Sequence, residues 1–440
     1  MKYAPIPSEL FVHNRARLAK KLKPNSVVIA VANDILPTNA DGSMPFRQNS
    51  DLFWLTGVDQ EETILMLYPD AHDREKQREM LFLRETSEHI AIWEGEKLTR
   101  ERAAEVTGID IRCIHWLDAF DTQFKTVMAQ ADHVYLNTNE HDRAAASLPT
   151  RERRFVDECR ARFPLHRYER LAKLMHQLRP VKHDVEVRLL QEACDITAAG
   201  FERVARFVKP GVGEWEVEAE LAHEFIRRKS RGFAYNPIIA TGKNGCVLHY
   251  VENHAVCQDG ELLLLDVAAE YANYNADLTR TIPVNGRFTK RQRQVYEAVL
   301  RVFRECCAIL RPGITQKEWN NAAGDLMERE LIGLKLLSAA DVKKQDPEKP
   351  LYKKYFMHGL GHHLGLDVHD VGLRSARVEV GNVFTVEPGI YIREEGLAVR
   401  LENDIVVGKK KNHDLMGHIP IEADEIEALM NDGVSRKAKR

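Results

Sequence analysis

The sequence predicts two domains of different class, an α/β domain over residues 1–175 and an α+β domain over residues 176–440. In the first, short strand-like runs alternate with helical stretches, which is typical of α/β domains. The boundary lies near residues 178–181, where short strand-like runs give way to long helical periods. Beyond it, the same order of elements occurs twice: a helix, a break formed by a basic residue, Pro and Gly, a second helix, and a strand. The prolines of the two breaks, Pro210 and Pro312, lie 102 residues apart. This repetition indicates that the second domain consists of two related halves.

The first domain opens with an amphipathic helix over residues 8–23. Apolar and β-branched runs predict five strands, over residues 26–31, 63–68, 80–83, 89–93 and 133–136, and helical stretches lie near 99–106 and 140–147. Neither G-x-x-x-x-G-K nor G-x-G-x-x-G occurs in this domain, so the sequence gives no sign of a phosphate-binding loop. The segment Phe46–Trp54 mixes polar and aromatic groups, which fits both a ligand-contacting segment and an ordinary loop.

The second domain alternates long helices with buried strands. Helical periodicity predicts helices over residues 184–208, 214–228, 290–310 and 316–331, and residues 235–240 form a strand. Two related halves that pack together create an interface between them. Pockets favour such interfaces, so we expect the functional site there.

Composition excludes several functional classes. A net charge of −3 gives no basic surface for nucleic acid. No apolar run approaches the roughly 18 residues of a membrane span, and the N-terminus lacks the apolar segment of a secretory signal. The 7 cysteines form no C-x-x-C pair, which is typical of reduced thiols. These features predict a cytoplasmic protein without nucleic-acid or membrane partners.

A glycine-rich histidine stretch stands out in the second half. His358, His362, His363 and His369 fall within twelve residues that also contain three glycines. Each glycine would cost about 1 kcal/mol in a helix interior, so the stretch favours a turn that brings imidazoles close to an ion or a small ligand. Surface loops also collect histidines, and the cluster alone does not decide between the two readings.

Four carboxylates complete a possible metal site. Asp266 and Glu387 each end an apolar strand, and Asp277 lies on a predicted returning strand that would place it beside Asp266. Over residues 397–404 polar and apolar residues alternate, which turns Arg400, Glu402 and Asp404 to one face.

The predicted donor set consists of Asp266, Asp277, Glu387, Glu402 and one or more of the histidines of residues 358–369. Such oxygen-rich ligands suit Mn²⁺, Co²⁺ or Zn²⁺. Four acids carry too much negative charge for one divalent ion. They suit two ions about 3.5–4 Å apart that share bridging carboxylates and a bridging hydroxide.

These motifs resemble those of a known family. Residues 358–370 resemble the signature of the proline-specific metallopeptidases, the Xaa-Pro aminopeptidase (aminopeptidase P) and prolidase group, and the order Asp, Asp, His, Glu, Glu is that of metallopeptidases with the pita-bread fold. Residues 46–51, 242–250 and 420–430 resemble further segments of aminopeptidase P, so the likeness covers nearly the whole chain.

The resemblance implies roles for individual residues. Asp266 would bind one ion, Asp277 and Glu402 would bridge two ions, and His362 and Glu387 would bind the other. His249, His358 and His369 would line the substrate site, and Arg400 would lie behind the metals, close to Asp277. Glu387 would accept a proton from the attacking water. Mn²⁺ is the usual metal of the family.

Two departures from the family pattern stand out. Close relatives often carry Ser and an aromatic residue where this chain has Gly361 and His363. Because His363 directly follows the presumed ligand, it is a competing candidate, but the alignment of the motif favours His362. The link between Tyr391 and Arg400 is shorter than in bacterial aminopeptidase P, which bears on how long a peptide the pocket admits.

The resemblance implies an aminopeptidase that hydrolyses the first bond of peptides with proline in the second position, acting as a homodimer or homotetramer. Trp93 either takes part in subunit contact or lies in the core. A prolidase, which cuts Xaa-Pro dipeptides, is the main alternative. A non-enzymatic pita-bread module that binds peptides is more remote, because such relatives lack several of the five ligands.

Overall fold

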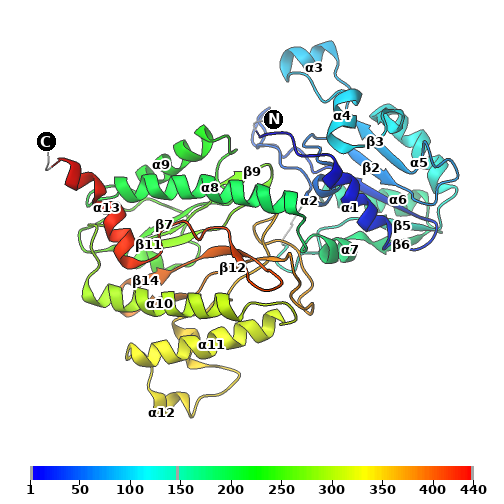
Figure 1. The fold of residues 1–440 in the computed structure, drawn as a ribbon. Coiled ribbons are helices and arrows are strands. Elements are labelled where there is room, and N and C mark those ends of the chain that lie inside the picture. Colours follow the sequence, from blue (N-terminus) through cyan, green and yellow to red (C-terminus); the bar gives the residue numbers. More distant parts are fainter. Residues whose placement is uncertain (1–2, 145–147, 438–440) are drawn as a thin grey trace. The chain divides into compact units, whose positions relative to one another are not determined.

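The structure is a computed structural model that describes residues 3–144 and 148–437. The chain forms two compact units, one of residues Ala4–Arg179 and one that runs from Pro180 onward. Figure 1 shows the elements of both units. Within the described residues, no helix is long and apolar enough to cross a membrane.

A six-stranded mixed sheet lies at the centre of the first unit, in the order β4-β3-β2-β1-β5-β6. Its strands are β1 (Ser26–Val31), β2 (Ile64–Leu67), β3 (Glu79–Leu83), β4 (Ile114–Trp116), β5 (His133–Leu136) and β6 (Arg167–Arg170). β1 pairs antiparallel with β2 and parallel with β5. Every residue of β1 is buried, as its continuous apolar run predicts for a central strand.

Helices surround this sheet. They are α1 (Glu9–Ala19), α2 (Ser50–Thr56), α3 (Glu88–Trp93), α4 (Arg100–Thr107), α5 (Phe120–Met128), α6 (Arg151–Arg162) and α7 (Leu171–Leu178). The predicted helices over 8–23 and 99–106 are confirmed as α1 and α4, and the predicted strands 26–31, 63–68, 80–83 and 133–136 as β1, β2, β3 and β5. Residues 46–49 are a loop that leads into α2, and Asn49 caps that helix.

Two predictions in this unit are wrong. Residues 89–93 belong to the helix α3, not to a strand, because the Ser87 hydroxyl accepts from the Ile90 N–H and caps the helix. None of the α3 residues is buried, so the alternation there does not mark a core face. Residues 140–144 are not helical, and residues 145–147 of that predicted helix lie outside the described part of the chain.

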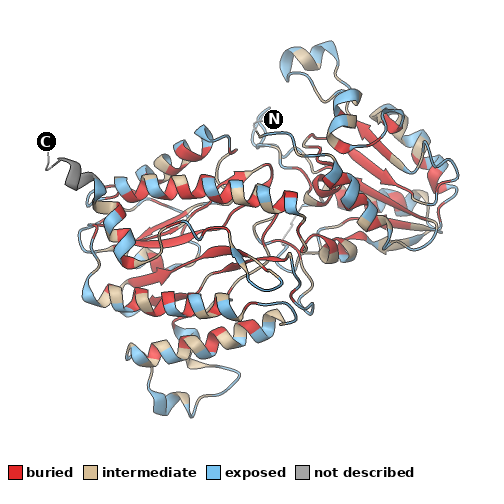
Figure 2. Cartoon of the chain, viewed as in Figure 1, coloured by how far each residue is buried: buried red, intermediate tan, exposed pale blue. Residues whose placement is uncertain are grey.

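The second unit places long helices around buried strands. Its helices are α8 (Asp184–Phe207), α9 (Glu214–Arg227), α10 (Lys290–Ile309), α11 (Gln316–Gly333), α12 (Ala339–Val342) and α13 (Ala423–Lys437). The first four confirm the predicted helices. Gly211 and Gly313 have φ values of 93° and 91° at the two Pro-Gly breaks, a conformation that glycine adopts without steric cost. Figure 2 shows the strands as buried and the long helices as buried along one side.

The strands of this unit form several small sheets. β11 (Thr279–Pro283), β8 (Leu262–Asp266) and β7 (Ile238–Thr241) form one, and β12 (Val383–Val386), β15 (Asn403–Val406) and β16 (His413–Asp414) form another. β13 (Gly389–Ile392) pairs with β14 (Leu397–Arg400), and β9 (Glu270–Tyr271) with β10 (Tyr274–Asn275). Each half thus has a helix pair followed by strands, α8 and α9 before β7 and β8, α10 and α11 before β12 and β13.

The two segments that carry acids depart in detail from the predictions. Asp266 pairs with Thr279 across β8 and β11, which confirms the hairpin, but Asp277 precedes β11. The predicted strand over 397–404 is broken, because β14 pairs with β13 whereas β15 pairs with β12. Glu402 lies at this crossover, where its N–H donates to the Thr279 carbonyl at 3.1 Å.

Candidate metal centre

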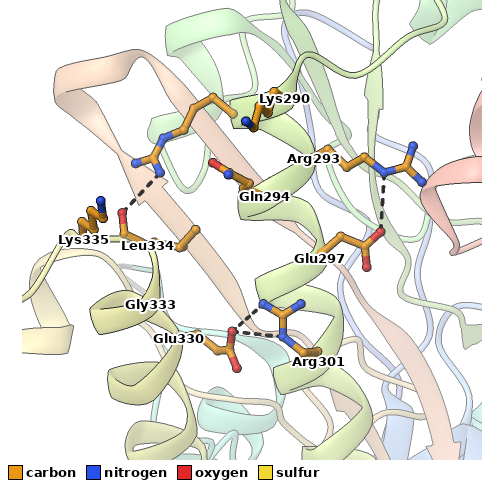
Figure 3. A pocket seen from close by; sticks show the side chains of 10 residues that line it. Lys290, Arg293, Gln294, Glu297, Arg301, Glu330, Gly333, Leu334 and Lys335 are labelled. Atoms are coloured by element: carbon orange, nitrogen blue, oxygen red, sulfur yellow. Dashed lines mark hydrogen bonds and ion pairs between the residues drawn. The ribbon is translucent and has the colours of Figure 1, made fainter.

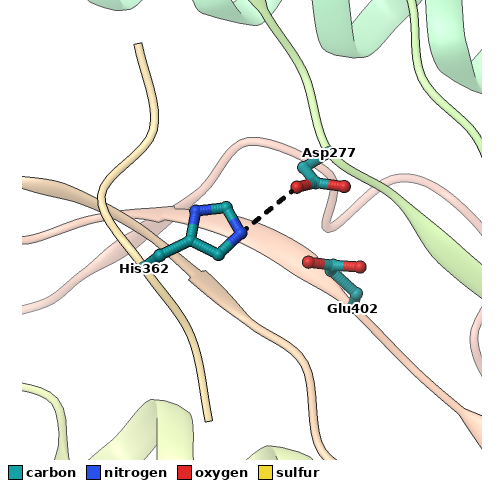
Figure 4. A group of neighbouring side chains, drawn as sticks. All are labelled: Asp277, His362 and Glu402. Atoms are coloured by element: carbon teal, nitrogen blue, oxygen red, sulfur yellow. Dashed lines mark ion pairs between the residues drawn. The ribbon is translucent and has the colours of Figure 1, made fainter. Parts of the chain in front are cut away.

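Three side chains from distant parts of the sequence meet in the second unit. Asp277 lies between β10 and β11, His362 precedes β12, and Glu402 lies between β14 and β15. One ligand atom of each lies within 4.8 Å of the other two, and Figure 4 shows the imidazole facing the two carboxylates. Asp277 and Glu402 are buried and His362 is half-buried. This arrangement of one nitrogen and several oxygen donors is able to hold a metal ion.

Asp266 and Glu387 join this group through shared contacts. The Tyr235 hydroxyl lies 2.6 Å from Asp266 Oδ1 and 2.7 Å from Asp277 Oδ1. It has one hydrogen, so it can donate to only one of the two at a time. Glu387 Oε1 lies 3.6 Å from His362 Nε2, which lies 3.5 Å from Asp277 Oδ2. The structure therefore brings together all five residues that were predicted as ligands. We call this group, which consists of Asp266, Asp277, His362, Glu387 and Glu402, the acid cluster.

Burial raises the pKa of three carboxyls in this cluster, those of Asp266, Glu387 and Glu402. The pKa of Glu387 rises to about 7, because burial and the charge of Asp277 outweigh the nearby His362. Four carboxylates that close cannot all ionise without a compensating positive charge. Divalent cations supply such charge, and the donor set of four carboxylates and one imidazole fits Mn²⁺, Co²⁺ or Zn²⁺.

The imidazole of His362 is oriented for metal binding. Its Nδ1 donates to the backbone carbonyl of His363 at 3.0 Å, which leaves Nε2 facing Asp277 and Glu387. Burial lowers the pKa of His362, but the hydrogen bond to Asp277 and the charges of both acids outweigh burial and raise it to about 9. A positive charge at this position is therefore favoured, whether a proton or a metal ion supplies it.

His363 lies outside the acid cluster. Its ring packs against Phe384 with the ring centroids 4.2 Å apart, and its Nδ1 is buried with no hydrogen-bond partner in the described part of the chain. Burial and the charge of Lys182 lower the pKa of His363 to about 3. The structure thus separates the two adjacent histidines, with His362 among the carboxylates and His363 held neutral in an apolar contact.

Replacing His363 with methionine is expected to reduce the amount by which the free energy of unfolding falls at low pH. The folded pKa of about 3 lies below the ordinary 6.5, so the contribution of His363 is complete above pH 6.5 and is lost as the pH falls from 6.5 toward 3. Because the His363 side chain is half-buried, this loss amounts to at most about 2 kcal/mol at pH 5. Urea unfolding at pH 8 and pH 5 measures it in both proteins. Equal losses in both would show that His363 is not the group involved.

Arg400 links the acid cluster to His358. Its Nη2 donates to Asp266 Oδ2 at 2.5 Å, and its Nη1 donates to the Tyr391 hydroxyl at 2.8 Å. Tyr391 in turn lies 2.8 Å from His358 Nε2, and the Nδ1 of that histidine lies 2.8 Å from the Gly359 carbonyl. His358 Nδ1 therefore donates and Nε2 accepts. The resemblance placed Arg400 close to Asp277, but the carboxylate to which it donates is Asp266.

The other two predicted substrate histidines lie in different surroundings. The His369 ring meets the His362 ring edge to face, with centroids 4.3 Å apart. His249 lies exposed on a turn after the short helix η3 (Gly242–Cys246). Burial and Arg400 lower the pKa of His358 to about 3, and the charge of His249 contributes to this shift. His369 thus lies against a cluster residue, and His249 is connected to the site only through its charge effect on His358.

The sequence reasoning missed three contacting residues. Tyr235 contacts two of the acids, Tyr391 connects Arg400 to His358, and the Thr279 hydroxyl donates to Glu402 Oε2 at 2.6 Å. Tyr235 precedes a strand and Tyr391 lies inside one, and neither position has a distinctive local pattern. Thr279 could have been found, because it directly follows the segment that carries Asp277.

A separate cavity of about 640 Å³ lies between α10 and α11 (Figure 3). Lys290, Arg291, Arg293 and Arg301 of α10 line it, and Arg301 donates to Glu330 of α11 at 2.6 Å. None of the predicted site residues borders this cavity. It is therefore distinct from the acid cluster.

Comparison with known proteins gives consistent results. The sequence model of the family described as "Metallopeptidase family M24" matches residues 188–409, and that of "Aminopeptidase P, N-terminal domain" matches residues 11–135. The chain is 33% identical to the Xaa-Pro aminopeptidase of Haemophilus influenzae and 34% identical to that of Escherichia coli, in each case over 97% of this chain and 98% of the relative.

Solved structures are also similar to this chain over nearly its full length. The aminopeptidase PepP of Pseudomonas aeruginosa matches with a TM-score of 0.88 at 31% identity, over 98% of this chain and 99% of that one. A zinc-substituted E. coli aminopeptidase P in complex with product matches with a TM-score of 0.86 at 32% identity, again over 98% and 99%. The similarity thus includes both compact units.

Proposed function

This chain belongs to metallopeptidase family M24, and we propose that it is an aminopeptidase that removes the first residue from peptides with proline in the second position. Membership makes the chain a hydrolase with the pita-bread catalytic fold. One observation carries the proposal, namely that the five-residue acid cluster occurs in a chain that also contains the aminopeptidase P N-terminal domain.

We propose that two divalent ions bind in the acid cluster, with Mn²⁺ as the first choice and Co²⁺ or Zn²⁺ as alternatives. Asp266 would hold one ion, His362 and Glu387 the other, and Asp277 and Glu402 both. The distances within 4.8 Å among Asp277, His362 and Glu402 support shared ligation. When bound, two such ions lower the pKa of a water molecule and polarise the scissile carbonyl.

The chain's own side chains would handle protons and the developing charge. Glu387 accepts a proton from the attacking water and passes it toward the proline nitrogen, which has no N–H of its own. His369 and His249 donate hydrogen bonds to the carbonyl oxygen as it gains negative charge. The edge-to-face contact of His369 with His362 and the exposed position of His249 support these roles.

His358 would contact the proline ring. Its Nδ1 lies 2.8 Å from the Gly359 carbonyl and its Nε2 lies 2.8 Å from the Tyr391 hydroxyl, so both ring nitrogens have partners within the protein. This leaves the part of the ring surface that is not packed against Phe356 and Tyr391 for an apolar contact. The arrangement favours contact with proline over proton transfer by His358.

A peptide-length series tests the proposed specificity. We expect kcat/KM for Arg-Pro-Pro to exceed that for Gly-Pro by at least about tenfold, because the residues beyond proline add binding energy in an aminopeptidase. The assay is release of the first amino acid after loading with defined amounts of Mn²⁺, Co²⁺ or Zn²⁺. A clear preference for Gly-Pro would instead identify a prolidase, and Arg-Ala-Ala serves as the control for the proline requirement.

We also propose that the chain forms a homodimer or homotetramer in the cytoplasm. The exposure of Ile92 (73%) and Trp93 (76%) on α3 supports a contact surface there. The seven cysteines, all of which are free thiols, support a reducing compartment.

A further inference from the structure

A buried ion pair contacts the loop of residues 362–370, which carries His362, His363 and His369. Lys182, just before α8, places its Nζ 2.8 Å from Asp370 Oδ2, although 188 residues separate them in the chain. Each side chain is only 1% exposed. Replacing such a pair with apolar residues is often neutral for stability, so burying these charges is poorly explained by stability alone. The surroundings of Asp370 indicate another role.

Asp370 closes the loop that carries two of the proposed site residues. Its N–H donates to the His363 carbonyl at 2.8 Å, and the same carbonyl accepts from Nδ1 of His362 at 3.0 Å. The position of this one oxygen therefore decides where Nε2 of His362 points. His369 directly precedes Asp370 in the chain and packs against His362.

The loop is folded tightly over the ion pair. A Cβ atom at Gly365 would lie 2.2 Å from Asp370 Oδ2 and 2.8 Å from Lys182 Nζ. On the other side, the backbone N–H of Asn275 donates to the Gly365 carbonyl at 2.9 Å, two residues from Asp277. An alanine at position 365 would therefore force the side chain of Asp370 or Lys182 to move.

The geometry points to the Lys182–Asp370 pair as a positioning device that holds the loop of residues 362–370 so that His362 and His369 face the acid cluster. The part that concerns His369 rests on the proposed peptidase function. The part that concerns His362 depends only on metal binding in the cluster.

Three variants test the device in the full-length protein. Lys182→Met and Asp370→Asn each remove one charge, and Gly365→Ala pushes the pair apart without changing any charge. We expect each to weaken Co²⁺ binding and to lower kcat by about 10- to 100-fold, because the groups that orient metal ligands have effects of this size. KM for Arg-Pro-Pro should change by less than about threefold, because the substrate pocket keeps its other contacts.

Co²⁺ titration followed by visible absorption reads the site directly, because band position and intensity report the ligand geometry. Wild-type protein should show saturable bands that shift in all three variants. Arg301→Met, which breaks the exposed pair with Glu330, is the matched control and should leave the spectrum and kcat unchanged. If a single variant fails to fold, the double variant Lys182→Met/Asp370→Asn removes both buried charges and should fold while retaining the weakened binding.

The outcomes separate the two proposals. Variants that lose thermal stability but keep wild-type Co²⁺ affinity, spectrum and kcat would show that the pair is purely structural and overturn the inference. A wild-type protein without activity on Xaa-Pro peptides would contradict the proposed function, yet the Co²⁺ titrations would still decide whether the pair orients His362.

Discussion

Replacing Asp277 with asparagine, or Glu402 with glutamine, is expected to lower kcat/KM by more than about 10³-fold and to reduce bound metal. Each acid lies in the group formed with His362, where the three ligand atoms are within 4.8 Å of one another. Both are buried, so solvent cannot replace the lost carboxylate charge. An amide keeps the shape of the side chain but binds divalent ions more weakly, and both proposed ions would lose a shared ligand.

Metal analysis and kinetics on the same samples check this expectation. Wild-type protein dialysed against Mn²⁺ should retain two ions per chain, and both variants should retain fewer. Asp325→Asn makes the same chemical change at an exposed position on α11 and should alter neither quantity. Full turnover by either site variant would rule out the arrangement with shared carboxylates.

The acids of the site could be predicted from the sequence because each one has a local signature, which for Glu402 is the alternation over residues 397–404. Asp266 and Glu387 end or follow apolar strands, and the returning segment that carries Asp277 was found from the same hairpin pattern. The residues alone did not decide between His362 and His363, because the two are adjacent in a glycine-rich loop, and only the resemblance to the family favoured His362. It depends on which imidazole turns toward the acids, and that follows from the His363 carbonyl and the packing against Phe384.

The contacts that could not be predicted from the sequence are those between segments that are far apart in the chain and meet only in the folded structure. Arg400 donates to Asp266, 134 residues earlier in the chain, and this partner could be identified only from the packing of β14 beside β8. The alternation over 397–404 looked like one strand because its period continues through Glu402. The break there arises because β13 and β12, which pair with its two parts, belong to different sheets.

Replacing Arg400 with lysine is expected to lower kcat about 10²-fold while the protein remains folded. The guanidinium donates at the same time to Asp266 Oδ2, the Tyr391 hydroxyl and Thr279 Oγ1, over 2.5, 2.8 and 3.0 Å. A lysine ammonium is a point charge on a flexible chain and cannot reproduce this planar fork. It can keep a charge beside Asp266, but Tyr391 would lose its donor and His358 would lose a fixed partner.

Arg15→Lys is the matched control for the loss of a buried, forked arginine. Arg15 in the other compact unit is also fully buried and donates to the carbonyls of Leu55 and Thr107. Both variants should lower the free energy of unfolding, by about 1–3 kcal/mol, because each leaves buried acceptors without donors. Only Arg400→Lys should lower kcat. Equal kcat values in the two variants would show that Arg400 acts on stability alone, and that the connection from Asp266 through Tyr391 to His358 does not contribute to catalysis.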